Sequence, residues 1–223
     1  MRTFLFDIDG TLLRTGGAGL HAIRTAMKDL FGVETLAHVE VRGRTDRGIL
    51  RDIFAAHEIV DSQSNWENFQ RVYLQYLPTS LSELPGYLLP GVESTLATLS
   101  QTNESALGLL TGNSRRAAKI KLAHFAVDHL FSFGGFGDHS TCRNEVAREA
   151  LVSAEQHLEE RLDKNQIWVI GDTPADITCG RVINARTVGV LTGGYDREAM
   201  QAAAPDFLLD DLQDFPRLIA ALA

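Results

Sequence analysis

Near its N-terminus the chain reads Thr3-Phe4-Leu5-Phe6-Asp7-Ile8-Asp9-Gly10-Thr11. The apolar residues at the start of this stretch form an uninterrupted run that is typical of a buried β-strand. Two aspartates then stand one residue apart, followed by glycine and threonine, where the strand should end and the chain turn. Because ligands of open α/β sheets bind outside the carboxyl ends of the strands, these acids are candidate site residues. A pair of carboxylates there needs an opposite charge, and a divalent cation is the commonest one.

Length and composition narrow the possible classes of protein. The 223 residues suit one large domain or a domain with an insertion, and 44% hydrophobic residues suffice for a buried core. The formal net charge of −8 disfavours nucleic acid as the main partner. No apolar run is long enough to span a membrane or to serve as a signal peptide before Asp7, so we expect neither. Cys142 and Cys179 are too few for a disulfide framework, which favours a reducing cytoplasm.

The chain divides into a helical stretch and an alternating stretch. Apolar residues recur at helical spacing between residues 15 and 88, and no convincing strand is present there. The segment 85–91, rich in proline and glycine, is expected to be a loop. Later in the chain short apolar runs alternate with helical stretches, and we expect strands at 106–110, 130–133, 167–170, 187–190 and 207–209. Apolar strands separated by helices predict an α/β fold, a Rossmann-like parallel-sheet core that carries a helical insertion.

Polar residues follow three of the expected strands. Asp7 and Asp9 follow the first strand, and Thr111-Gly112-Asn113-Ser114 follows the strand at 106–110. Gly171-Asp172-Thr173-Pro174-Ala175-Asp176 follows the strand at 167–170. Because the carboxyl ends of parallel strands share one edge of a sheet, these distant segments should meet in one crevice.

In this order and context the segments resemble motifs of the haloacid dehalogenase superfamily. The matching segments are those of the first, second and fourth motifs, namely Asp7-Ile8-Asp9-Gly10-Thr11, Leu110-Thr111-Gly112-Asn113 and Gly171-Asp172-Thr173-Pro174-Ala175-Asp176. Each motif is weak alone, but the ordered set is specific and the resemblance spans the whole chain. The layout is similar to that of phosphoglycolate phosphatases. It implies a core domain at 1–14 and 89–223, with a helical cap domain at 15–88.

The resemblance implies a phosphatase that hydrolyses a small phosphorylated metabolite with the help of Mg²⁺. Asp7 would be the nucleophile that forms an aspartyl-phosphate, and Asp9 would be the general acid and then the base. Mg²⁺ would be held by the Asp7 side chain, the Asp9 backbone carbonyl and Asp172. Asp176 would orient the metal shell, with a cap on the following helix as the less favoured alternative.

Further residues would bind the phosphate and the leaving group. The Thr111 hydroxyl, with backbone groups around Gly10, Gly112 and Asn113, would hold the phosphoryl oxygens. Arg44, which lies in the expected cap within the segment Arg42-Gly43-Arg44-Thr45-Asp46, is the candidate specificity residue. A plain surface loop is the alternative interpretation of that segment.

The cation of the family's third motif departs from the usual lysine–proline form. Arg143, just before an expected long helix, is the favoured candidate, because a guanidinium stays protonated and presents a fork of donors. Lys164 is the alternative. Lys119 and Lys121, together with Arg115 and Arg116, are expected to lie on a solvent-exposed helix face.

Other functions remain open at this stage. A sugar phosphomutase of the same fold shares the core residues, whereas a dehalogenase and a phosphonate hydrolase are disfavoured by the presence of Asp9. A non-catalytic phosphoacceptor or regulatory protein is the alternative of another class. The sequence does not name the phosphate ester, and it leaves a monomer and a homodimer equally open.

Overall fold

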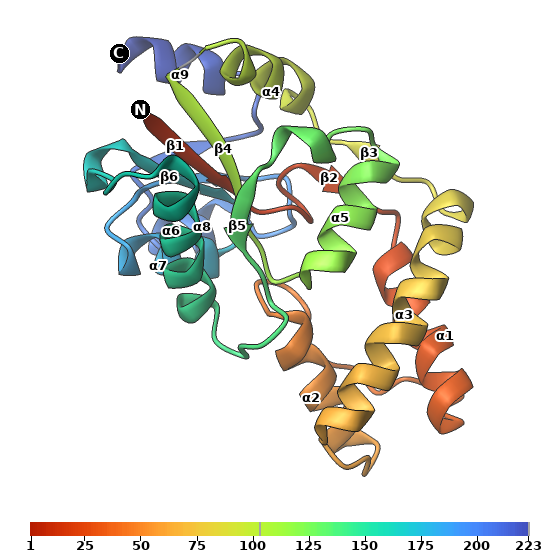
Figure 1. Ribbon diagram of the computed structural model, residues 1–223. Helices are drawn as coiled ribbons and strands as arrows, with labels where there is room; N and C mark the ends of the chain where they lie inside the picture. The colour runs from red at the N-terminus through yellow and green to blue at the C-terminus, as the bar shows by residue number, and fades with distance from the viewer. Residues whose placement is uncertain (103, 223) are drawn as a thin grey trace.

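The computed structural model describes residues 1–102 and 104–222, apart from the side chain of Lys164. Six of the described strands form a parallel sheet in the order β5-β4-β1-β6-β7-β8 (Figure 1). Their bounds are Arg2–Phe6 for β1, Ser105–Leu110 for β4, Phe133–Gly135 for β5, Ile167–Gly171 for β6, Arg186–Val190 for β7 and Phe207–Leu209 for β8. The predicted α/β, Rossmann-like class is therefore confirmed. Since β1 lies between β4 and β6, its carboxyl end opens at the point where the connections diverge to either side.

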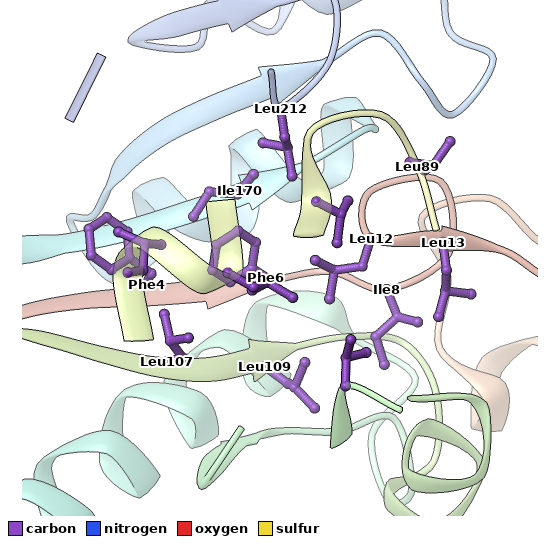
Figure 2. Close-up of a cluster of buried hydrophobic side chains, with 14 of the residues drawn as sticks. Phe4, Phe6, Ile8, Leu12, Leu13, Leu89, Leu107, Leu109, Ile170 and Leu212 are labelled. Atoms are coloured by element: carbon purple, nitrogen blue, oxygen red, sulfur yellow. The ribbon is translucent and has the colours of Figure 1, made fainter. Parts of the chain in front are cut away.

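Four helices cover the two faces of the sheet: α4 (Val92–Ser100), α6 (Arg143–Leu158), α7 (Pro174–Val182) and α9 (Phe215–Ala221). Phe4 and Phe6 pack on the face that α4 and α9 cover (Figure 2). Leu5 belongs to the opposite cluster, together with buried residues of α6 and α7. The N-terminal strand is apolar without alternation because both of its faces are buried.

Three helices form a separate layer beside the sheet: α1 (Ala18–Phe31), α2 (Asp46–Ala56) and α3 (Gln63–Glu83). We call them the helical layer. Their apolar faces form their own cluster, which Ala117 of α5 (Arg115–His124) joins from the core (Figure 1). A short antiparallel ribbon of β2 (Leu13–Arg14) and β3 (Tyr87–Leu88) connects the layer to the sheet. The segment 85–91, expected to be a loop, therefore contains a two-residue strand.

The strand expected at 130–133 is displaced in the structure. A 3₁₀ turn, η1 (Asp128–Leu130), occupies its first part, and β5 begins only at Phe133. The strand continues through two glycines, which sequence patterns disfavour in strands. A side chain on Gly135 would overlap the Val146 carbonyl of α6, so the close approach of this helix explains the glycine.

The remaining described elements lie in the second half of the chain: η2 (Lys164–Gln166) and α8 (Arg197–Ala202). Asp196 caps the N-terminus of α8, since its side chain accepts a hydrogen bond from the Ala199 N–H at 2.8 Å. Within the described ranges, no helix has the length and apolar character that crossing a bilayer requires.

Candidate active site

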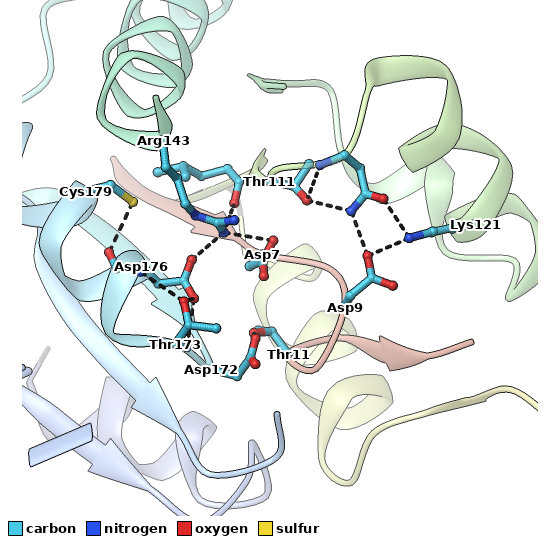
Figure 3. A network of polar contacts seen from close by, with 12 residues as sticks. Asp7, Asp9, Thr11, Thr111, Lys121, Arg143, Asp172, Thr173, Asp176 and Cys179 are labelled. Atoms are coloured by element: carbon cyan, nitrogen blue, oxygen red, sulfur yellow. Dashed lines mark hydrogen bonds and ion pairs between the residues drawn. The ribbon is translucent and has the colours of Figure 1, made fainter. Parts of the chain in front are cut away.

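The carboxyl ends of β1, β4 and β6 bring the three motif segments together. Strand β1 pairs with both neighbours, so that Phe6 lies beside Leu109 on one side and Ile170 on the other. The Asp7 N–H donates to the Ile170 carbonyl at 2.9 Å, which extends the pairing to the aspartate itself. In Figure 3, Asp7 lies between Arg143 on one side and Asp9 on the other.

Three buried carboxylates form the centre of the site. Oxygens of Asp7, Asp172 and Asp176 all lie within 4.8 Å of one another. Burial raises the pKa of Asp7 to about 6; Arg143 opposes this shift, and the nearby Asp176 charge adds to it. Burial also holds the pKa of Asp172 well above its usual range, and the charges of Asp176 and Asp7 reinforce the effect. The cluster therefore carries negative charge that its surroundings only partly offset.

Arg143 supplies the positive charge that faces this cluster. It is the first residue of α6 and is buried, with Nη2 lying 3.1 Å from Asp7 Oδ1. The same nitrogen also pairs with Asp176 Oδ1. Arg143 thus stands where the resemblance places the cation of the third motif. The alternative, Lys164, has its side chain outside the described part of the chain.

The acidic cluster suits a hard divalent cation. Three buried carboxylates face one guanidinium, and all the free donor atoms are oxygens, the ligands that Mg²⁺ prefers. Asp176 has the least freedom: Oδ2 accepts from the Thr173 N–H at 2.9 Å and from Thr173 Oγ1 at 2.8 Å, as part of the capping box that starts α7. With Oδ1 paired to Arg143, Asp176 both caps its helix and braces the site.

Gly10 lets the first and fourth motifs approach each other. Its φ of 89° is a conformation that glycine tolerates, and a Cβ there would lie 2.6 Å from Asp172 Oδ2. The Thr11 hydroxyl donates to Asp172 Oδ1 at 2.9 Å and fixes that carboxylate. Gly10 is thus required by the close contact between the two loops.

Thr111 and Asn113 of the second motif are joined by hydrogen bonds. The buried Thr111 Oγ1 accepts from Asn113 Nδ2 at 2.9 Å and from the Asn113 N–H at 3.3 Å. Asn113 Nδ2 also donates to Asp9 Oδ2 at 2.7 Å. The Asn113 amide therefore links the second motif to the predicted general acid.

Lys121 is the main correction to the sequence-based prediction. It is only 5% exposed, and its Nζ lies 2.6 Å from Asp9 Oδ2 and 2.6 Å from Asn113 Oδ1. The prediction of an exposed face was wrong for this residue because the helical layer covers that side of α5, whereas Lys119 is exposed as expected. Ala117, one turn earlier on the same face, is fully buried, and this spacing was the available signal.

The helical layer contacts the second motif through the loop that contains Arg44. A side chain on Gly112 would overlap the Arg44 carbonyl, so backbone packs directly on backbone. The Arg44 guanidinium pairs with Asp52 Oδ2 at 2.7 Å, within its own layer. The two candidates Arg44 and Gly112 thus lie together at the boundary between layer and core.

Asp46, which was not singled out from the sequence, secures the same boundary. Its N–H donates to the Gly112 carbonyl at 2.7 Å, and its Oδ2 accepts from the Ser114 N–H at 2.7 Å. Burial raises the pKa of Asp46 to about 6, and the nearby Lys121 charge opposes the shift. Its position at the start of a helix concealed its role, because an acid there is ordinarily a cap.

A cavity of about 540 Å³ lies between the helical layer and the sheet edge. Asp7, Asp9 and Arg143 line its floor, whereas Ile23 and Ile49 belong to its apolar wall in the helical layer. The wall suits a compact organic group, and the floor suits an anion or a metal-bound anion.

Comparison with known proteins identifies the family. The family model of haloacid dehalogenase-like hydrolases matches residues 4–190 of this chain. A phosphoglycolate phosphatase of Synechococcus elongatus is 26% identical, over 100% of this chain and 99% of that protein. The pyrophosphatase PpaX of Oceanobacillus iheyensis is 24% identical, over 98% and 97% of the two chains.

Solved structures share the same fold. A hydrolase from Pseudomonas syringae superposes with a TM-score of 0.74 at 21% identity, covering 100% of both chains. A predicted phosphoglycolate phosphatase from Haemophilus somnus gives a TM-score of 0.75 at 21% identity, covering 98% of both. The chain belongs to the haloacid dehalogenase-like hydrolase family, so the expected superfamily and the expectation of an enzyme are confirmed. The expected class, phosphoric monoester hydrolases, agrees with the names of relatives.

Proposed function

We propose that this protein is a Mg²⁺-dependent phosphatase that hydrolyses a small phosphate ester through an aspartyl-phosphate. The observation that carries the proposal is the buried Asp7 carboxylate, which ends β1 beside Asp172 and is paired with Arg143. A nucleophile needs an anionic oxygen near a compensating cation, and this arrangement provides both. The names of the curated relatives, phosphoglycolate phosphatase and pyrophosphatase, support the same reaction class.

The chemistry uses the two aspartates of the first motif in turn. An Asp7 carboxylate oxygen attacks phosphorus as the bond to the leaving oxygen breaks, and Asp9 gives that oxygen a proton. Asp9 then takes a proton from a water molecule whose oxygen attacks the same phosphorus. The bond between phosphorus and the Asp7 oxygen breaks, inorganic phosphate leaves, and the Asp7 carboxylate is restored. Arg143 offsets the negative charge of Asp7 and of the phosphoryl group throughout.

The acidic cluster would hold the metal ion. The Asp7 side chain, the Asp9 backbone carbonyl and Asp172 would be its protein ligands, with Asp176 and Arg143 bracing them. When bound, Mg²⁺ would supply charge neutralisation for the phosphoryl oxygens.

Binding of the ester would be divided between the core and the helical layer. Gly10, Gly112 and Asn113 line the cavity where phosphoryl oxygens would lie, and the fully buried Thr111 would act from behind them through its hydrogen bonds to Asn113. Arg44, from the layer above, would contribute to the choice of leaving group. We propose that residues 15–88 act as a cap domain on the core of 1–14 and 89–223, and that closure excludes water.

The substrate would be a compact phosphorylated metabolite. Phosphoglycolate and pyrophosphate are the first candidates because relatives carry those names. The cytoplasmic location that two free cysteines favour belongs to the same proposal.

A panel of phosphate compounds tests the proposal. Release of inorganic phosphate would be measured from phosphoglycolate, pyrophosphate, sugar phosphates and an aryl phosphate, each with Mg²⁺ and with EDTA. We expect release that requires Mg²⁺ and is absent in Asp7→Asn. Isomerisation of a sugar phosphate without phosphate release would favour a phosphomutase, and inactivity on every compound would contradict the proposal.

A further inference from the structure

The reaction steps assigned to Asp7, Asp9 and Arg143 do not use the buried Lys121. It lies on α5, where the helical layer covers the core, and its ammonium is enclosed on several sides. A Cβ placed on Gly19 of α1 would lie 3.7 Å from Lys121 Nζ, so this first turn of the layer closes over it. Burying an ammonium is unfavourable unless charged partners offset the loss of hydration. The partners of Lys121 therefore explain why a lysine is tolerated there.

Lys121 closes a ring of hydrogen bonds with Asp9 and Asn113. Its Nζ donates to Asp9 Oδ2 and to Asn113 Oδ1, both at 2.6 Å. Asn113 Nδ2 donates to the same Asp9 oxygen at 2.7 Å and to Thr111 at 2.9 Å. Every polar atom of the Asn113 amide thus has a protein partner, and the orientation of this amide is fixed by the lysine.

The ring leaves the two oxygens of Asp9 unequal. Oδ2 accepts two hydrogen bonds, one of them from a charged donor, whereas Oδ1 has no hydrogen-bond partner among the described residues. The Asp9 side chain is 42% exposed and lines the cavity. One oxygen is therefore anchored, and the other is available to a group in the cavity.

We propose that Lys121 is a positioning residue that orients Asp9 for proton transfer to the leaving group. The inference rests on the proposed phosphatase function. As the Asp7–phosphorus bond forms and the bond to the leaving oxygen breaks, that oxygen receives its electron pair together with a proton from Asp9 Oδ1. Lys121 acts by holding Oδ2. The fixed geometry supplies the orientation on which proton transfer depends.

The contacts of Lys121 favour a positioning role over two simpler roles, namely substrate binding and the filling of space in the core. Lys121 lines the cavity, but an ammonium that only bound substrate would direct its donors into that space, whereas two of the donors of Lys121 are directed to protein atoms. A lysine that only filled space would be replaceable by an apolar side chain of similar length, as the apolar cluster around Ala117 shows. The proposal therefore predicts a selective catalytic loss rather than a loss of binding or of folding.

The test compares Lys121→Met with Lys121→Arg, and uses Lys119→Met on the exposed face of α5 as the matched control. Single-turnover release of the leaving group would be measured for an alkyl phosphate and for p-nitrophenyl phosphate, whose leaving group needs little protonation. For Lys121→Met we expect a loss of about 100-fold on the alkyl ester, a much smaller loss on the aryl ester and an unchanged KM. Lys121→Arg should recover part of the rate, and Lys119→Met should match the wild type.

Several results would overturn the inference. These results are an equal loss of rate on both esters in Lys121→Met, a raised KM with kcat unchanged in that variant, and full activity of that variant. Combining Lys121→Met with Asp9→Asn provides a second measurement, because residues that act as a unit are not additive. We expect the double variant to be no slower than Asp9→Asn alone, and a further full loss would contradict the proposal. If the wild type releases no phosphate from either ester, the proposed function itself fails, which is a distinct outcome.

Discussion

Arg143 Nη2 lies 3.1 Å from Asp7 Oδ1, and the same nitrogen pairs with Asp176. One buried guanidinium therefore joins the end of β1, the start of α6 and the first turn of α7. The contact links stability to chemistry, because the charge that makes the acidic cluster tolerable is also the charge that would face the phosphoryl group.

Replacing Arg143 should lower the stability of the folded protein as well as its activity. We expect Arg143→Met to lower the free energy of unfolding of the metal-free protein at pH 7.5 by about 3 kcal/mol, because two buried carboxylates lose their partner. Arg143→Lys should lose less of the free energy of unfolding than Arg143→Met, because the ammonium keeps the positive charge although it replaces a fork of donors with one point charge. Urea unfolding measures the difference, and an unchanged midpoint in Arg143→Met would show that the pair contributes nothing.

Replacing Asp7 should have the opposite effect on stability. The pKa of Asp7 is raised from 3.8 to about 6, so its ionised form is disfavoured in the folded protein even with Arg143 beside it. Stability is therefore lost as the pH rises from about 4 through 6. We expect Asp7→Asn to stabilise the metal-free protein at pH 7.5 by about 1–3 kcal/mol, while abolishing turnover.

The control for Asp7 is the same measurement at pH 4, which lies well below the folded pKa of about 6 and close to the unfolded value of 3.8, so that little of the pH-dependent penalty is present. The gain in the free energy of unfolding from Asp7→Asn should then largely disappear. A gain of equal size at both pH values would point to packing rather than charge.

Mg²⁺ should stabilise the protein in a pH-dependent manner. Because burial raises the pKa of Asp7 and Asp172, protons compete with the metal for these carboxylates as the pH falls, and for Asp7 they do so below about pH 6. We expect millimolar Mg²⁺ to raise the melting temperature clearly at pH 7.5 and little at pH 5. Thermal unfolding with matched EDTA samples checks this, and an equal shift at both pH values would contradict the assignment of the metal to this cluster.

Arg44 should influence the choice of substrate. Its loop packs on Gly112, and its side chain lines the cavity from the helical layer. We expect Arg44→Ala to change the ranking of kcat/KM across the ester panel by about tenfold between substrates. Arg51→Ala is the matched control, because Arg51 pairs with the same Asp52 and does not line the cavity. An unchanged ranking in Arg44→Ala would remove this residue from the specificity assignment.

The sequence could predict the site residues that lie at the ends of strands. Asp7 and Asp172 follow uninterrupted apolar runs, and the rules of parallel sheets bring such ends to one edge. Their meeting could be anticipated because it depends on local pattern and simple topology. The strand β5 was misplaced because its glycines reflect contact with α6, which no local pattern records.

Lys121 and Asp46 show the limit of that approach. Both are charged residues in helices, where an exposed position is the usual outcome. Lys121 is buried and Asp46 is half-buried because the helical layer packs on α5, a contact between segments far apart in the chain. Such residues become recognisable only when tertiary packing removes them from solvent.

Direct detection of the aspartyl-phosphate tests the central claim. Asp9→Asn would be mixed with Mg²⁺ and an aryl phosphate, whose leaving group needs no acid, and then quenched with acid. Without its general base this variant should accumulate the phosphoenzyme, and peptide mass spectrometry should find one phosphoryl group on Asp7 that is absent from Asp7→Asn. Phosphate release by the wild type with no adduct on Asp7, or with an adduct on another residue, would contradict the account.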